Sequence, residues 1–254
     1  MDNVNKTLYI PLYGKAYVSR RGLILRDPKA EEIWTAEGFP LRGKSASKWL
    51  AYYMGMRAAV FDRWVQAQMD ADPAAVVLHI GCGLDSRCQR VSGGNPWYDV
   101  DFPEVIAERR QYYEETERYC MIGADVMDPS FLDALPGGNA IVIMEGVSMY
   151  LPSEALKQAL DRVAAHFDSV HLLMDCYTTF AARASRYKNP INDVGVTEVY
   201  GMDDPNALEG FVREHDMTPA DLIDELHGME RRIFRNLYAG SLAKKLYRLY
   251  EYRR

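Results

Sequence analysis

Cysteine is scarce in this sequence, and none of it stands in a pattern that indicates disulfides or a structural metal. The 254 residues contain four cysteines, with no C-x-x-C pair and no histidine partners at zinc spacing: Cys82, Cys88, Cys120 and Cys176. No apolar stretch approaches the ~20 residues that a membrane-spanning helix needs. The first residues also lack the basic-then-apolar order of a secretory signal. We therefore expect a cytoplasmic protein with reduced thiols, no metal site and no membrane partner.

Positively charged residues are also fewer than negatively charged ones. The chain has 30 Lys and Arg against 36 Asp and Glu, which gives a formal net charge of −6 at pH 7. Nonspecific nucleic-acid binding depends on an excess of cations that neutralises phosphates, so we expect no nucleic-acid partner. With 48% hydrophobic residues the chain has a globular composition. At this length it can build a core without disulfides.

No internal repeat, low-complexity tract or Pro/Gly/Ser-rich linker divides the chain, which favours one domain over residues 1–254. Residues 1–72 predict helices. Asp27-Pro28 supplies the cap and the first-turn residue of a helix start, and residues 45–69 place apolar side chains at helical spacing. From residue 73 short apolar runs alternate with helical stretches. We therefore expect a helical N-terminal cap, 1–72, on an α/β core, 73–254.

Several apolar runs in the core have the length and composition of buried strands. They lie at residues 75–80, 97–100, 119–122, 140–144 and 170–174. Helical stretches at 103–114 and 153–166 lie between them, as the βαβ units of a parallel sheet require. The C-terminal part is less regular; there we predict strands over 211–217 and 246–252, with a helix over 229–245 between them.

A glycine turn, Gly81-Cys82-Gly83, follows the first predicted strand. In open parallel sheets ligands bind at the carboxyl ends of strands, and glycines let backbone N–H groups approach a ligand closely. Acidic residues end or follow the later strands, namely Asp99, Asp101, Asp125 and Glu145. A carboxylate about twenty residues beyond the first glycine can accept both hydrogen bonds of a ribose diol. The pattern favours a nucleoside cofactor over a purely structural turn.

Two residues separate the candidate cofactors. The dinucleotide fingerprint requires a third glycine where this chain has Ser86, and Asp85 beside it would repel a pyrophosphate. The methionine end of S-adenosylmethionine instead carries an ammonium group that a carboxylate attracts. The motif therefore favours S-adenosylmethionine, and a nicotinamide dehydrogenase is the weaker alternative.

Further segments occur in a recognisable order along the chain. They are residues 10–16 (IPLYGKA), 27–30 (DPKA), 57–62, 81–87, 97–103, 125–129 and 145–152 (EGVSMYLP). In these segments the chain resembles the leucine carboxyl methyltransferase family, particularly its bacterial branch associated with polyketide biosynthesis. The resemblance implies a class I methyltransferase fold, Rossmann-like, with a mostly parallel seven-stranded sheet and helices on both faces. It also implies an S-adenosylmethionine-dependent O-methyltransferase.

The resemblance implies a role for each strand end. Gly81 and Gly83, with Cys82 between them, would lie against the methionine moiety of the cofactor. Asp101 would accept the ribose hydroxyls. The adenine would be held by Asp125, whose carboxylate accepts from the exocyclic amine, and by the backbone around Val126.

The methionine end of the cofactor would meet charged residues. Glu145 would close this side, while Lys15 and Arg57 are similar to the two basic residues that hold the cofactor carboxylate in the family. His79 departs from the Asp, Glu or Asn that methyltransferases usually carry two residues before the first glycine. A neutral imidazole can accept a hydrogen bond from the ammonium but supplies no charge, so Asp85 could compensate; a histidine satisfied within the strand is the alternative.

The chemical class of the methyl acceptor depends on whether the reaction needs a base. A carboxylate with a pKa of ~4 is ionised at pH 7, whereas a phenol near 10 needs a base to offset roughly 4 kcal/mol. No histidine falls at the carboxyl end of a predicted strand, and Glu145 and Asp175 are explained by cofactor and scaffold. We predict a methyl ester on a small-molecule carboxylate, such as a polyketide-like aromatic acid. The alternatives are methylation of a hydroxyl or phenol, and a non-catalytic cofactor-binding protein.

Polar and aromatic residues near predicted loops or strand ends are the candidates for holding this acceptor. For the arginines among them a solvated surface position is the favoured interpretation. The candidates are Tyr13, Arg20, Tyr150 and Tyr177, with Arg21 and Arg87 as further cations. The sequence names no catalytic residue.

Overall fold

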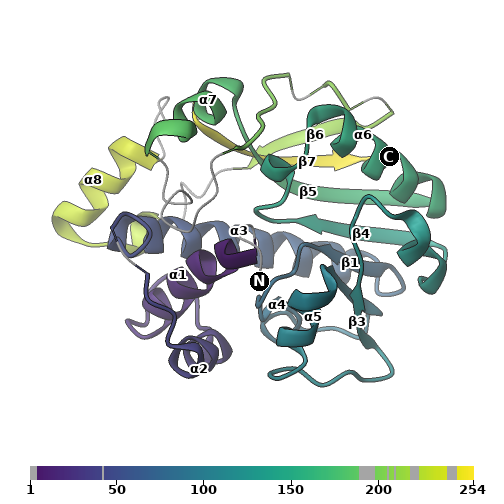
Figure 1. The fold of residues 1–254 in the computed structure, drawn as a ribbon, viewed down its shortest axis with the longest axis horizontal. Coiled ribbons are helices and arrows are strands. Elements are labelled where there is room, and N and C mark those ends of the chain that lie inside the picture. The colour runs from purple at the N-terminus through teal and green to yellow at the C-terminus, as the bar shows by residue number, and fades with distance from the viewer. Residues whose placement is uncertain are drawn as a thin grey trace.

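The computed structural model describes residues 5–41, 43–188, 198–204, 206–208, 210–217, 223–238 and 245–254. The strands form one sheet with helices on both sides (Figure 1). They are β1 (Val76–Ile80), β2 (Trp97–Asp101), β3 (Tyr119–Gly123), β4 (Asn139–Met144), β5 (Ser169–Tyr177), β6 (Val212–Met217) and β7 (Tyr247–Arg253). Their order across the sheet is β3-β2-β1-β4-β5-β7-β6.

Strands β1 to β5 are parallel, and β7 runs antiparallel to both β5 and β6. The predicted mostly parallel α/β sheet is therefore confirmed. Each predicted strand is found within a few residues of its expected place, and β5 extends beyond its apolar run to Tyr177. This extension carries Asp175 and Tyr177 to the carboxyl edge of the sheet, where β7 pairs Tyr177 with Tyr247.

The helix predicted from Asp27-Pro28 begins where its capping residue predicts. Asp27 caps the second helix by accepting a hydrogen bond from Ala30 N at 2.9 Å. The helical segments are η1 (Asn5–Leu8), α1 (Tyr9–Ser19), α2 (Pro28–Glu37), α3 (Lys48–Ala71), α4 (Arg87–Arg90), α5 (Pro103–Arg109), η2 (Pro129–Ala134), η3 (Ser148–Tyr150), α6 (Ser153–His166), α7 (Thr179–Lys188) and α8 (Gly228–Tyr238). Among the described residues, no helix is long and apolar enough to cross a membrane.

Two helix predictions need correction. The helix predicted over 103–114 ends at Arg109, because the chain turns there and Tyr112 N and Tyr113 N both donate to Arg109 O. The helix predicted over 229–245 is found as α8, Gly228–Tyr238; residues 239–244 lie outside the described residues.

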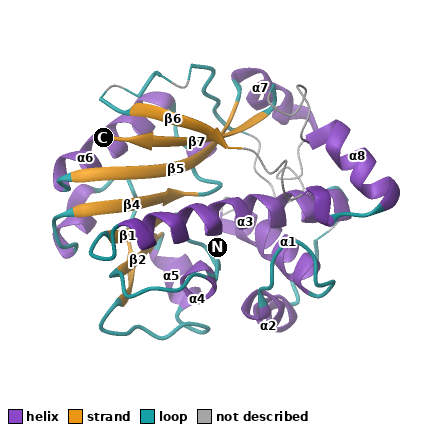
Figure 2. Ribbon diagram, turned by 180° about the vertical axis from the view of Figure 1, so that it is seen from behind, coloured by secondary structure: helices purple, strands orange, loops and turns teal. Residues whose placement is uncertain are grey.

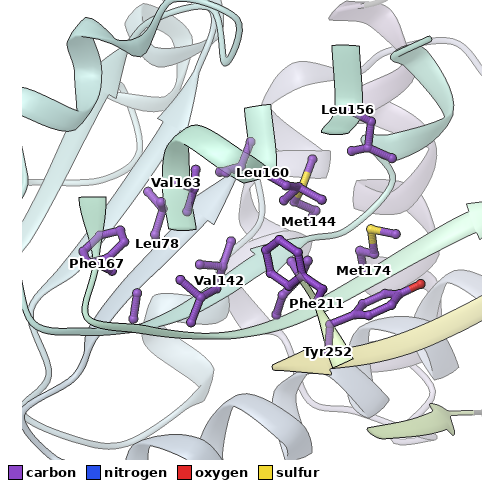
Figure 3. Close-up of a cluster of buried hydrophobic side chains, with 14 of the residues drawn as sticks. Leu78, Val142, Met144, Leu156, Leu160, Val163, Phe167, Met174, Phe211 and Tyr252 are labelled. Carbon is purple, nitrogen blue, oxygen red and sulfur yellow. The ribbon is translucent and has the colours of Figure 1, made fainter. Parts of the chain in front are cut away.

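The sheet is buried on both faces, and successive residues of each strand point to opposite sides. On one face α6 packs its apolar side chains on Leu78 and Val142 (Figure 3). On the other face α3 packs on Val77 and Ile141. Figure 2 shows α3 crossing the sheet, and β4 pointing toward the side that carries α1, α7 and α8. The carboxyl ends of the strands therefore face the N-terminal helices.

Helix α1 packs tightly against α3 because glycines stand at the contact. A Cβ atom at Gly14 would lie 2.5 Å from Met54 Cβ, and one at Gly55 would lie 2.8 Å from Val18 Cγ2. Lys15 follows Gly14 on α1, and Arg57 lies one half-turn beyond Gly55 on α3. Close packing of the two helices thus brings two cations of the N-terminal cap toward the sheet edge.

We expect Leu160→Ala to lower the free energy of unfolding by about 2–5 kcal/mol, because it leaves a cavity in a closely packed core. Leu160 is 1% exposed and lies between α6 and the sheet. Chemical denaturation followed by circular dichroism measures the loss. The matched control is Gln158→Ala on the exposed side of the same helix, for which we expect a change within about 0.5 kcal/mol. Equal effects of the two changes would contradict the assigned core.

Candidate functional site

The glycine turn after β1 adopts a backbone that favours glycine. Gly81 and Gly83 have φ angles of 68° and 50°. A Cβ atom at Gly81 would lie 2.1 Å from Val147 Cγ2. Gly81 N donates to Val100 O of β2 at 2.7 Å. The turn is therefore closely packed between the ends of β2 and β4, and a side chain at Gly81 would close this space.

Asp101 lies beside the turn, at the end of β2. Its Oδ2 accepts from Gly83 N at 2.7 Å and its Oδ1 from Phe102 N at 2.8 Å. Burial raises the pKa of Asp101, although both N–H groups act in the opposite direction. Each carboxylate oxygen accepts one backbone hydrogen bond and keeps a further lone pair. The carboxylate is thus oriented, and it can accept the two hydroxyls of a ribose.

The adenine candidates follow β3. Register pairs Asp101 with Gly123, so residues after β3 lie at the same sheet edge. Asp125 is exposed, and its Oδ1 accepts from Met127 N at 2.9 Å. Val126 is partly buried against the core. The structure therefore brings Asp101, Asp125 and Val126 to neighbouring positions on this edge.

The charged candidates from the N-terminal cap and the strand ends meet in one buried group. Lys15 Nζ lies 3.1 Å from Asp85 Oδ1, and Arg57 Nε lies 2.8 Å from Glu145 Oε1. Arg87 joins the two pairs: its Nη2 lies 3.2 Å from Asp85 Oδ2 and donates to Glu145 Oε2. We call Lys15, Arg57, Asp85, Arg87 and Glu145 the charged cluster.

The surface position favoured for Arg87 is wrong. Its side chain is fully buried, and its Nε also donates to Asp62 Oδ1 at 2.7 Å. Three carboxylates from α3, the glycine turn and β4 thus surround one guanidinium. The local sequence carries no sign of this, because Asp62 and Glu145 lie far from Arg87 along the chain. Arg20 and Arg21, in contrast, are exposed as expected.

The cations keep the cluster carboxylates ionised. Burial alone would raise the pKa of Glu145, but Arg87 and Arg57 lower it to about 2. Burial would likewise raise the pKa of Asp85, which Arg87, Arg90 and Lys15 hold well below its usual range. The cluster therefore presents ionised carboxylates and paired cations over the physiological pH range. Such a set can exchange partners with the ammonium and carboxylate of an amino acid.

His79 lies in the interior of β1. Its Nδ1 is 3.2 Å from Asp99 Oδ1, without the alignment of a hydrogen bond. Its Nε2 is 3.5 Å from Arg87 Nη1. The ring thus connects two buried ion pairs behind the glycine turn.

A buried layer that sequence reasoning missed supports the turn. Asp99 accepts hydrogen bonds from Arg109 Nη2 and from Tyr119 OH. Burial would raise the pKa of Asp99, but Arg109 helps to lower it to about 2. Arg109 Nη1 donates to Gly83 O at 2.9 Å, and Tyr113 OH donates to Leu84 O at 3.2 Å. Arg109 therefore ties the turn to β2. Asp99 serves this layer, and Asp101 alone of the pair remains for a ligand.

A second group of polar side chains lies at the ends of β5 and β7. Asp175 is fully buried, and its Oδ2 lies 3.0 Å from Arg57 Nη1. Arg57 Nη1 also donates to Tyr247 OH at 2.8 Å, and Tyr247 OH donates to Asp175. The Tyr247 ring lies against Tyr177 and Tyr53, with centroid distances of 5.1 and 5.5 Å. Asp175 and Tyr247 were not among the predicted site residues, since their pairing depends on the antiparallel register of β5 and β7.

The remaining acceptor candidates separate into two places. Tyr150 is partly buried in the same apolar group as Tyr177 and Tyr247, and burial raises its pKa. Tyr13 OH instead donates to Ala46 O at 3.1 Å. Arg20 Nη2 donates to Thr35 Oγ1 of α2 at 2.6 Å on the exposed side of the cap. The structure therefore brings Tyr150 and Tyr177 together at the strand ends, but not Tyr13 and Arg20.

The residues present fit S-adenosylmethionine. An aspartate, Asp101, that two backbone N–H groups orient, a glycine turn that a side chain would close, and the charged cluster follow one another at the carboxyl ends of β2, β1 and β4. Among the described residues, no cluster of His, Cys, Asp or Glu could hold a metal ion. The fold and this edge define a class I S-adenosylmethionine-dependent methyltransferase.

Comparisons with known proteins agree. The leucine carboxyl methyltransferase family model matches residues 11–164. The chain is 32% identical to the tetracenomycin polyketide synthesis O-methyltransferase TcmP of Streptomyces glaucescens, over 84% of this chain and 80% of that protein. It is 28% identical to the S-adenosyl-L-methionine-dependent methyltransferase dpfgK of Gibberella zeae, over 66% of this chain and 62% of that protein.

A solved structure of similar fold is magnesium protoporphyrin IX methyltransferase from Synechocystis, with a TM-score of 0.51 and 13% identity; the match covers 88% of this chain and 93% of that one. The chain belongs to the leucine carboxyl methyltransferase family, and it is an S-adenosylmethionine-dependent O-methyltransferase. The expected family, fold class, enzyme class and cofactor are thereby confirmed.

Asp101→Asn should weaken adenosylhomocysteine binding roughly tenfold or more, because hydrogen bonds to a charged acceptor are worth about 1.5–3 kcal/mol. Isothermal titration calorimetry measures the change. Asp133→Asn, at an exposed aspartate after β3, is the matched control and should bind as the unchanged protein does. Equal affinities of Asp101→Asn and the control would remove Asp101 from the cofactor site.

The affinity for adenosylhomocysteine should also decrease as the pH is lowered. The decrease should begin at a higher pH than it would with a carboxyl group of ordinary pKa. Burial raises the pKa of Asp101, so the carboxylate takes up its proton at a higher pH than usual and loses its second acceptor there. Glu145 and Asp85 stay ionised in this interval, because their pKa values are lowered. Titrations at a series of pH values should show a larger acid limb in the unchanged protein than in Asp101→Asn, where Asp175, whose pKa is also raised, still titrates.

Proposed function

We propose that this enzyme forms a methyl ester on a small-molecule carboxylate, of the size and aromatic character of a polyketide acid. The family description names carboxyl methylation, and the relative TcmP is named for polyketide synthesis. A carboxylate is ionised at pH 7, so the reaction needs alignment and no base. Among the described histidine side chains, none lies at the carboxyl ends of β4 and β5. The family description carries the proposal.

We propose the following roles for the residues of the site. Asp101 holds the ribose, and Asp125 with the backbone at Val126 holds the adenine. The turn around Gly81, Cys82 and Gly83 lies along the methionine moiety.

In the charged cluster Lys15 and Arg57 take the cofactor carboxylate, and Glu145 takes the ammonium. Asp85 keeps this end negative, and His79 supports Arg87 from the strand interior. When bound, S-adenosylmethionine supplies an electrophilic methyl group on a sulfonium. The chain's own residues hold both partners in line and keep water from them.

We propose that the acceptor lies against Tyr150 and Tyr177. Both belong to the partly buried apolar group at the ends of β5 and η3, which also contains Tyr53, Tyr247 and Met149. Aromatic rings favour offset or edge-to-face contact with another ring, so this group suits an aromatic acceptor. Tyr13 and Arg20 have partners of their own in the cap and would act only if the cap rearranged around a larger acceptor.

The proposal takes residues 1–254 as one methyltransferase domain, with 1–72 as the cap and 73–254 as the core, acting in the cytoplasm on a small molecule. A second candidate reaction is methylation of a hydroxyl. One observation favours it: Asp175 and Tyr247 lie at the carboxyl edge of the sheet in mutual hydrogen bonding. The two reactions give products with different stability in alkali.

Incubation with labelled S-adenosylmethionine and a panel of aromatic acids of one to four rings should yield products that lose their label in mild alkali, because esters hydrolyse and aryl ethers do not. Thin-layer chromatography before and after alkali measures this. Omission of enzyme and heat-inactivated enzyme are the controls. Label that enters only alkali-stable products would overturn the assignment to a carboxylate.

A further inference from the structure

Arg57 lies between two buried carboxylates whose pKa values move in opposite directions. Two cations, Arg57 and Arg87, lower the pKa of Glu145 to about 2 against the effect of burial. Among the described residues Asp175 pairs with Arg57, and burial outweighs this pairing and raises the pKa of Asp175. When two carboxylates share a site and their pKa values are shifted in opposite directions, they take different roles. The carboxylate with the higher pKa is suited to accept a proton.

Asp175 reaches the acceptor side through Tyr247. Tyr247 OH donates its single proton to Asp175 Oδ2 and accepts from Arg57 Nη1 at 2.8 Å. A phenolic oxygen has two lone pairs, so one lone pair of Tyr247 has no partner among the described residues. Toward a ligand Tyr247 can therefore accept a hydrogen bond but cannot donate one. An ionised carboxylate has no proton to offer at this position, whereas a hydroxyl has one.

Tyr247 lies in the group that we assign to the acceptor. Its ring is partly buried beside Tyr177 and Tyr53, in the apolar group that we assign to the acceptor. Register places Asp175, Tyr177 and Tyr247 on the α3 face of the sheet at its carboxyl edge, where β4 also ends. The relay requires that a ring lying against these tyrosines bring a substituent to Tyr247 Oη.

We propose that Tyr247 and Asp175 form a proton relay that gives this site a further activity, the O-methylation of a phenolic hydroxyl. This inference rests on the proposed function, which supplies the location of the acceptor. It adds phenols as a second class of acceptor, served by Tyr247 and Asp175. The relay supplies the base that a phenol needs and that the histidines do not provide.

The step balances as a pair of proton transfers and one displacement. The acceptor O–H bond breaks and its proton passes to Tyr247 Oη, while the proton of Tyr247 passes to Asp175 Oδ2. The acceptor oxygen uses its freed electron pair to bond the methyl carbon, and the pair of the broken S–CH₃ bond remains on sulfur. Asp175 then returns its proton to solvent through Tyr247. No oxidant, reductant or further reactant is needed.

The groups around Asp175 define the pH dependence. It faces Arg57 from α3, Tyr247 from β7, Glu145 at the end of β4 and the N–H of Gly146, which donates to Asp175 Oδ1 at 2.7 Å. Only ionised Asp175 can accept the proton. Ether formation should therefore fall as pH decreases through the raised pKa of Asp175, above the range of an ordinary aspartate, while Glu145 stays ionised.

The test uses 6-hydroxy-2-naphthoic acid, which carries both acceptor groups on one ring system. Ester and ether products are separated chromatographically for the unchanged enzyme, Tyr247→Phe and Asp175→Asn. We expect the ether-to-ester ratio to fall roughly 10²-fold in both variants, the usual effect of losing a general base. The matched control is Tyr250→Phe, since Tyr250 lies on the same strand but its hydroxyl accepts from Arg248 Nη1 on the opposite face.

Each outcome has a consequence. A ratio in Tyr247→Phe equal to that in Tyr250→Phe would overturn the relay. Ester alone from the unchanged enzyme would overturn the further activity and leave the proposed function intact. Formation of neither product would contradict the proposed function itself.

Discussion

The buried guanidinium of Arg57 is the interaction on which the site depends. It joins α3 to the ends of β4, β5 and β7 through Glu145, Asp175 and Tyr247. A buried charge is tolerated only when it is paired and hydrogen-bonded, and removing one partner leaves the others uncompensated. These elements are therefore held at one relative position by a single cation.

The glycine turn is fixed from the opposite side by a comparable arrangement. Arg109 is fully buried between Asp99 and the carbonyl of Gly83, and Asp101 accepts the N–H of the same glycine. The backbone N–H and the carbonyl of Gly83 are thus both hydrogen-bonded. Such preorganisation lowers the cost of binding.

Local patterns were sufficient for the elements and for part of the site. The apolar runs predicted the strands, Asp27-Pro28 predicted a helix start, and strand-end chemistry alone led to the proposal of Gly81, Gly83 and Asp101 as cofactor-site residues. The surface position of Arg87 was wrong, and Arg109, Asp175 and Tyr247 were missed. These residues act through partners distant in sequence, so that no window of neighbouring residues contains the interaction.

The sequence by itself determined the fold class and the kind of cofactor, because hydrophobic periodicity and glycine are local constraints on backbone and burial. The tertiary structure decided which charges are buried together and how they are shared. A side chain's solvation and pKa depend on all groups within a few ångströms. Those groups come here from α1, α3, β4, β5 and β7, which only the folded chain brings together.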